Sequence, residues 1–128
     1  MTPYVRASSI ALLAVGFAGC RDSAAERDAF TVEAERVRSI TTTGGRLDAV
    51  GEVVREPLRV SQSWRLTLQA DWATFAAEAA RSLAATYRCT AEADRLSCAR
   101  SIPGDQFSLS YTRAEEGHVK ARLEARPD

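Results

Sequence analysis

The alternation of apolar and polar residues after residue 57 constrains the fold of this chain more than any other feature. In residues 58–70 nearly every second side chain is apolar, and only Gln62 interrupts the apolar side. The residues on that side are Leu58, Val60, Trp64, Leu66, Leu68 and Ala70. Period-two alternation of this length predicts a half-buried β-strand, with the clearest signal over Ser63–Ala70.

Four shorter segments after residue 86 repeat this alternation. Their apolar residues are Tyr87, Cys89 and Ala91; Leu96, Cys98 and Ile102; Phe107, Leu109 and Tyr111; and Val119, Ala121 and Leu123. Turn residues separate the later segments at 103–105, Pro-Gly-Asp, and at 115–117, Glu-Glu-Gly. The pattern predicts an antiparallel four-stranded meander with one dry face and one wet face.

Between the long strand and the meander, the apolar spacing changes to that of a helix. Asp71 is the predicted N-cap of a helix running from Trp72 to about Thr86, because a carboxylate there can accept amide hydrogens of the first turn. One stripe collects the apolar residues Trp72, Phe75, Ala76, Ala79 and Leu83. This stripe predicts a helix that packs on the dry face of the sheet.

Earlier parts of the chain carry weaker signals. Residues 46–55 indicate a strand interrupted by Gly51 and ended by Glu56-Pro57. Residues 21–40 are charged and alanine-rich, and are compatible with either a short docked helix or a flexible tether. The predicted fold class is therefore α+β, with one helix on an antiparallel sheet of five or six strands that ends in a four-stranded meander.

The first twenty residues have the organisation of an export signal. A short segment with Arg6 precedes the apolar run Ile10–Phe17, which is far shorter than the ~20 residues of a membrane-spanning helix. The segment Phe17-Ala18-Gly19-Cys20 resembles the lipobox of bacterial lipoproteins, although Phe17 stands where that family usually has Leu. An ordinary secretory signal cleaved after Ala18 is the alternative.

The lipoprotein resemblance implies a cleaved leader over residues 1–19 and acyl chains on Cys20, the first residue of the mature protein. Two or three acyl chains make a lasting membrane anchor. Sorting rules of that family favour the outer membrane, since Arg21 rather than Asp follows the cysteine. The predicted organisation is a leader over 1–19, a lipidated N-terminus and tether over 20–45, and one domain over 46–128 in the periplasm.

Three cysteines in an exported protein leave one without an intramolecular partner. Lipidation of Cys20 accounts for one of them and leaves Cys89 and Cys98 to pair. Placing these two opposite each other sets Ala91 opposite Leu96, and both sulfurs then point to one face, as a cross-strand disulfide requires. Two reduced, buried thiols are the alternative.

Charge and residue content narrow the function classes. The chain has 17 basic and 17 acidic residues, which gives no reason to expect nucleic acid as a partner. His118 is the only histidine, so a zinc site that needs several imidazoles is excluded, and we expect no metal, cofactor or catalytic residue. The aromatic residues Trp64, Trp72, Tyr87 and Tyr111 all fall on predicted apolar sides, which favours the core over carbohydrate stacking.

The wet face of the meander is the candidate contact surface. It is rich in hydroxyls and mildly basic, and the residues expected to face a partner are Arg88, Thr90, Ser108, Ser110, Lys120 and Arg122. A partner protein or a glycan of the envelope would suit such a face, and a plain solvated sheet is the alternative. The sequence says nothing about the oligomeric state.

These features together predict a membrane-anchored envelope lipoprotein that works as a non-catalytic binding or assembly module. One alternative is an anchored inhibitor of an envelope-directed hydrolase such as lysozyme. A small periplasmic hydrolase built around His118 and nearby acids is another alternative.

We expect mass spectrometry of the mature N-terminus to find Cys20 as the first residue, with its sulfur acylated. An unmodified mature chain that starts at Gly19 would contradict the lipoprotein interpretation.

Overall fold

A computed structural model describes residues 29–41 and 44–127. The predicted leader lies outside these residues, and so do Cys20 and residues 20–28 and 42–43 of the predicted lipidated N-terminus and tether. The chain divides into two units, Met1–Glu33 and Ala34–Asp128. In the first unit the described residues, 29–33, are helical, and the sheet belongs to the second unit.

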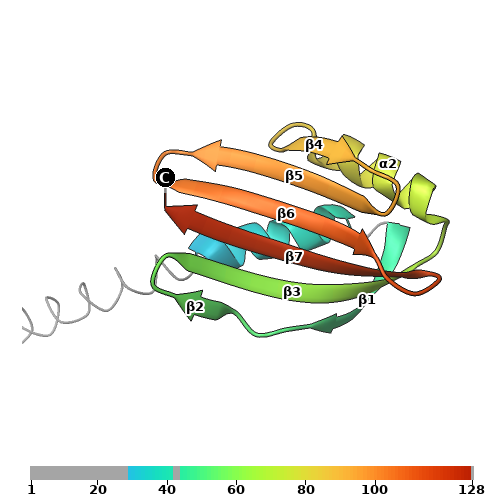
Figure 1. Cartoon of the computed structure of the whole chain (residues 1–128), viewed down its shortest axis with the longest axis horizontal. Coiled ribbons are helices and arrows are strands. Elements are labelled where there is room, and N and C mark those ends of the chain that lie inside the picture. Colours follow the sequence, from blue (N-terminus) through green and yellow to red (C-terminus); the bar gives the residue numbers. More distant parts are fainter. Residues whose placement is uncertain (1–28, 42–43, 128) are drawn as a thin grey trace, which may run out of the picture. The chain divides into compact units, whose positions relative to one another are not determined.

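The second unit is built on one antiparallel sheet, as the alternation predicts. Its elements are β1 (Gly45–Val50), β2 (Val54–Glu56), β3 (Arg59–Leu68), α2 (Trp72–Leu83), β4 (Arg88–Ala91), β5 (Arg95–Ile102), β6 (Asp105–Arg113) and β7 (His118–Pro127). The strand order is β1-β3-β7-β6-β5-β4, and β2 also pairs with β3 (Figure 1). The predicted α+β class is confirmed, with seven strands and two helices packed on the sheet.

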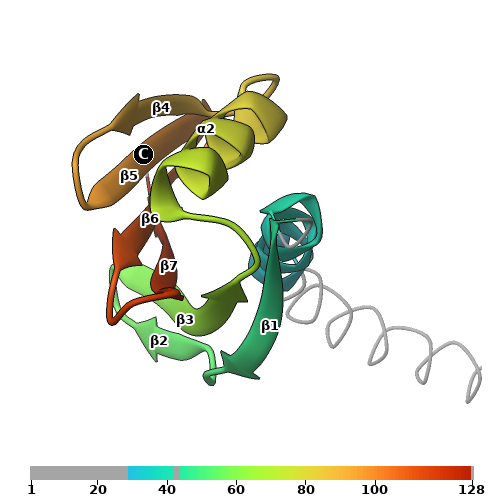
Figure 2. The ribbon, with the colours of Figure 1, turned by 90° about the vertical axis from the view of Figure 1, so that its right-hand side faces the viewer.

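Both helices of this unit cover the same face of the sheet. Figure 2 shows α2 and the end of the first helix, residues 34–41, on one side of the strands. The core between the layers contains the side chains that the alternation assigns to the dry face, among them Trp64, Leu66, Leu96, Leu109, Tyr111, Val119, Ala121 and Leu123. No described helix covers the opposite face, which is open to solvent.

Helix α2 forms where its sequence predicts and ends one turn earlier. The Asp71 carboxylate accepts the backbone N–H of Thr74 at 2.8 Å, so the predicted N-cap is confirmed. The whole predicted stripe is buried: Trp72, Phe75, Ala76, Ala79 and Leu83. After Leu83 the chain tightens, since its carbonyl accepts N–H groups from both Thr86 and Tyr87, and this turn leads directly into β4.

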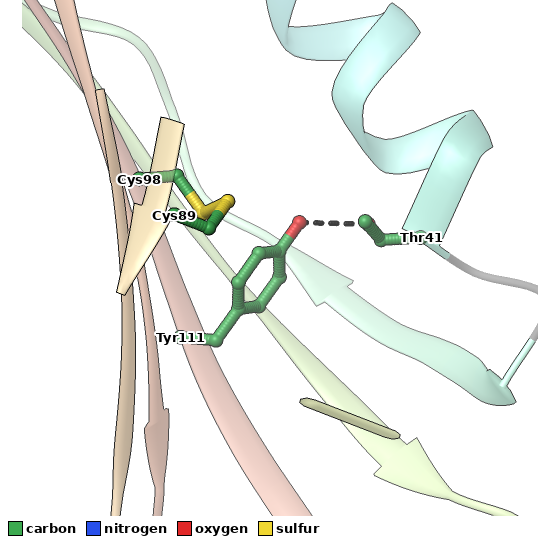
Figure 3. Close-up of a disulfide and its surroundings, with 4 residues drawn as sticks. All are labelled: Thr41, Cys89, Cys98 and Tyr111. Carbon is green, nitrogen blue, oxygen red and sulfur yellow. Dashed lines mark hydrogen bonds between the residues drawn. A yellow bond between two sulfur atoms is a disulfide. The ribbon is translucent and has the colours of Figure 1, made fainter. Parts of the chain in front are cut away.

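The first helix joins the sheet through a buried hydroxyl pair. Thr41 Oγ1 donates to the Val37 carbonyl at 2.8 Å, so the 2.7 Å contact between Thr41 and Tyr111 must use the tyrosine proton (Figure 3). Burial raises the pKa of Tyr111, which keeps the phenol protonated and able to donate. The sequence left two alternatives for this segment, a docked helix or a flexible tether. Residues 34–41 form a helix that is docked on the core.

Two arginines on the same helix extend this attachment. The Arg38 side chain donates to Gln62 Oε1 at 3.0 Å, and its guanidinium lies 5.6 Å from the centre of the Trp64 ring. The Arg36 side chain donates to Thr86 Oγ1 at 3.1 Å and lies 5.9 Å from the Tyr87 ring. Cations over aromatic rings add attraction that aliphatic contacts lack.

The predicted disulfide joins Cys89 on β4 to Cys98 on β5, and the register pairs Ala91 with Leu96 as expected. Figure 3 shows its sulfurs on the side of the sheet that carries the Tyr111 ring. By the chain-entropy relation, closing so short a loop contributes about 3 kcal/mol to stability. Strand β4 is an edge strand whose neighbour in the sheet is β5. The bridge holds these two strands in register.

Near β2 the structure departs from the simple alternation. Leu58 is 72% exposed in the β2–β3 turn, so its predicted place on the apolar side is wrong. Gln62, which breaks the apolar side, is buried because its amide donates to the Gly51 carbonyl at 2.8 Å and its oxygen accepts from Arg38. The predicted strand over 46–55 is split at this point into β1 and β2.

Replacing either member of the Thr41–Tyr111 pair should lower the free energy of unfolding of this unit, and the two replacements should lower it by different amounts. Tyr111→Phe leaves the Thr41 proton on its carbonyl acceptor and should cost about 1 kcal/mol, whereas Thr41→Val strands a buried phenolic donor and should cost about 1–3 kcal/mol. Urea unfolding of both variants measures the difference. A larger loss for Tyr111→Phe would contradict the assigned direction of the bond.

Candidate functional site

The open face of the sheet carries two rows of mostly polar side chains, in which serine and threonine stand beside charged residues. One row runs across four strands through Thr90, Ser97, Ser110 and Arg122, which are register partners from β4 to β7. The next row runs through Arg88, Ala99, Ser108 and Glu124. Neighbouring strands lie about 4.8 Å apart, so each row forms a nearly continuous polar line. We call this surface the hydroxyl face.

A hollow of about 520 Å³ lies over these two rows. Its lining residues are Arg88, Thr90, Arg95, Ser97, Cys98, Ala99, Ser108, Leu109, Ser110, Arg122 and Glu124. Five of the six residues predicted to face a partner line it together: Arg88, Thr90, Ser108, Ser110 and Arg122. Most of the other lining residues have small side chains, namely Thr90, Ser97, Ala99, Ser108 and Ser110, and three arginines stand among them.

The sixth residue, Lys120, lies one row away. It is the register partner of Thr112 on β6 and of Arg65 on β3. Together with Arg65 and His118 it lines a second hollow of about 260 Å³ on the same side of the sheet. The structure therefore brings all six residues to one face but divides them between two hollows.

The charge in the larger hollow is predominantly positive. Its one acid, Glu124, already accepts from Arg59 at 3.2 Å and from Arg126 at 3.4 Å. Hydrogen bonds from Arg59 to Glu56 and then to Glu124 raise the pKa of that arginine, so it remains charged. The local acid is thus matched by cations that come from outside the hollow.

The three arginines that line the hollow have no such match. Arg88, Arg95 and Arg122 are exposed, and the described part of the chain offers none of them an ion-pair partner. A chain with equal numbers of basic and acidic residues therefore presents a locally cationic surface. Such a surface attracts anionic groups.

A polar cluster that links three strands lies beside the second hollow, and two of its members, Asp48 and His118, line it. The Thr67 hydroxyl donates a short hydrogen bond to Asp48 and lies 3.4 Å from His118 Nδ1. That hydrogen bond, with smaller contributions from Arg46 and His118, lowers the pKa of Asp48 below its usual value. The cluster joins residues on β1, β3 and β7 at one margin of the sheet.

This arrangement differs from that of an activated nucleophile. In a catalytic triad the imidazole stands between the hydroxyl and the carboxylate and takes the hydroxyl proton. Here the Thr67 hydroxyl stands between Asp48 and His118 and donates its hydrogen bond to the carboxylate. Residues 29–41 and 44–127 contain no group of three or more His, Cys, Asp or Glu side chains placed to hold a metal ion.

The predicted aromatic residues lie in the core. Trp64, Trp72, Tyr87 and Tyr111 are at most 9% exposed, which confirms the prediction that they pack inside. They come from the dry face or from the helix that covers it, so none of them is presented on the hydroxyl face.

Within the described ranges, no helix has the length and apolar character that crossing a membrane demands.

Sequence reasoning missed two features of this face. Arg95 follows from the same register that predicts the disulfide, because it is the second residue before Ser97 and so points to the same side. The Asp48–Thr67–His118 cluster carried no such signal, since it depends on β7 pairing with β3 across a long stretch of chain.

Comparison of the chain with protein-family models, with curated proteins and with solved structures returned no match.

The Thr67→Val variant should raise the pKa of Asp48 toward its usual value of about 3.9. In the wild-type protein the folded pKa of Asp48 is depressed, so its ionised form stabilises the fold above the unfolded pKa. That stabilisation is lost as pH falls through the depressed folded pKa. Carboxylate NMR titration measures the shift in Thr67→Val, with Thr112→Val as the matched control on the same face. An unchanged Asp48 pKa in Thr67→Val would contradict the assignment.

Proposed function

We propose that the chain is a lipid-anchored envelope protein that works as a non-catalytic binding or assembly module, with the hydroxyl face as its contact surface. The observation that carries the proposal is the 520 Å³ hollow on that face, with three arginines that have no ion-pair partner in the described chain. Surfaces of this kind hold charge available for another molecule.

The layered fold supports this assignment of roles to the two faces. The helices cover the centre of the dry face, where Leu96 and Leu123 are completely buried, whereas Leu47 and Val50 on β1 stay 38% and 44% exposed. The hydroxyl face needs no covering to stabilise the fold, because its serine and threonine side chains are solvated at little cost. A partner docking there would displace water from serine and threonine side chains, which lose little side-chain entropy when they are ordered.

Anchoring at Cys20 is part of the proposal and rests on the lipobox resemblance. The oxidised pair Cys89–Cys98 is consistent with it, because disulfides persist in oxidising compartments such as the periplasm. We place the module at the outer membrane with its domain in the periplasm. Partners within reach would be envelope proteins or glycans.

A photoreactive amino acid at Ser110 or Arg88 should crosslink the module to a specific envelope partner in living cells. Both positions line the hollow, so a bound partner would lie within reach of the reactive group. The same amino acid at Ser82, which is exposed on α2, is the matched control. Equal patterns of products from Ser110 and Ser82 would count against the hydroxyl face as the contact surface.

A further inference from the structure

We infer that the hydroxyl face binds an acidic polypeptide segment, through several carboxylates held at once by Arg88, Arg95 and Arg122. This inference rests on the proposed function and names the chemistry of its partner. It follows from three properties of the face: the charge of the hollow, the spacing of its arginines, and the kinds of side chain on its floor.

The charge selects an anionic partner. Glu124 is occupied by Arg59 and Arg126, so the remaining guanidinium groups of the hollow are available to a ligand. A guanidinium presents a planar pair of N–H donors that matches the two oxygens of a carboxylate. The hydroxyls of Thr90, Ser97 and Ser110 lie between the arginines and can both donate and accept.

The spacing selects a partner with several carboxylates. The arginines stand on β4, β5 and β7, and β4 is three strands from β7. At about 4.8 Å for each step between strands, they span roughly 14 Å across the sheet. One carboxylate cannot reach all three. A segment with acidic side chains distributed along it can.

The floor favours a polypeptide over an acidic glycan. Sugar rings present apolar faces that bind well on aromatic side chains, and the aromatic residues of the sheet point to the dry face instead. Hydroxyl rows offer hydrogen bonds to peptide N–H and C=O groups as well as to carboxylates.

Binding of poly-L-glutamate to the full chain in nonionic detergent tests the inference by isothermal titration calorimetry. We expect saturable binding that weakens as salt is added, because these charges are exposed to screening. Free glutamate at the same carboxylate concentration should bind far more weakly, since it cannot span the arginines.

Charge-removing variants then locate the site. Arg95→Gln and Arg122→Gln should each weaken poly-L-glutamate binding about fivefold, the effect of losing one exposed ion pair worth about 1 kcal/mol. Arg81→Gln removes the same charge from α2, outside the hydroxyl face, and should leave the affinity unchanged. Urea midpoints equal to wild type would verify that all three variants are folded.

Four results would overturn the inference. Absence of binding would do so, as would equal losses in Arg81→Gln and Arg122→Gln, which would indicate a general effect of net charge. Tighter binding of polygalacturonate than of poly-L-glutamate would assign the face to an acidic glycan. A crosslinked envelope partner without an acidic segment would also overturn the inference, while leaving the proposed function intact.

Discussion

The cross-strand register of the meander is the constraint on which the rest of the structure depends. Side chains alternate strictly between the two faces of a strand, so a slip of one residue would move every core residue to solvent. The disulfide between Cys89 and Cys98 pins this register at the margin where pairing is weakest. The same register puts Leu96 and Tyr111 in the core and Ser97 and Ser110 on the open face.

The helical layer depends on that register in turn. Tyr111 reaches Thr41 only because β6 directs its ring to the dry face, and Arg38 covers Trp64 for the same reason on β3. The first helix is therefore attached by specific polar contacts as well as by buried alanine and valine. Because the helices cover the centre of the dry face, we propose the hydroxyl face as the surface on which the module meets a partner.

Sequence patterns predicted the parts of this fold that rest on local periodicity. Helix α2, its cap at Asp71, and the pairing of Cys89 with Cys98 are all confirmed, since each depends on residues close together in the chain. Leu58 was assigned to the wrong side because two residues of turn separate β2 from β3, and periodicity does not reveal where a turn begins. The sequence did not predict whether residues 34–41 dock on the sheet, because charged side chains are compatible both with solvent and with the polar contacts that these residues make.

Most residues of the candidate site were predictable for the same reason. Arg88, Thr90, Ser108, Ser110 and Arg122 share a hollow because alternation and consecutive hairpins decide which side chains become neighbours. The pairing of β3 with β7 brings together residues more than fifty positions apart, and with them Asp48, Thr67 and His118. The local sequence pattern of β3 does not indicate that β7 is its neighbour, and that of β7 does not indicate β3. The electrostatic isolation of the three arginines likewise required knowledge of where Arg59 and Arg126 lie.

The central claim is that a partner covers the hydroxyl face in the cell, and protection of a single side chain tests it most directly. Ser110→Cys and Ser82→Cys introduce a thiol on the hydroxyl face and on α2, and in each case the cysteine is nearly the size of the serine it replaces. A small alkylating reagent should modify the cysteine at position 110 more slowly in intact cells than in purified protein, and the cysteine at position 82 at the same rate in both. Equal rates at position 110 in cells and in purified protein would contradict the claim.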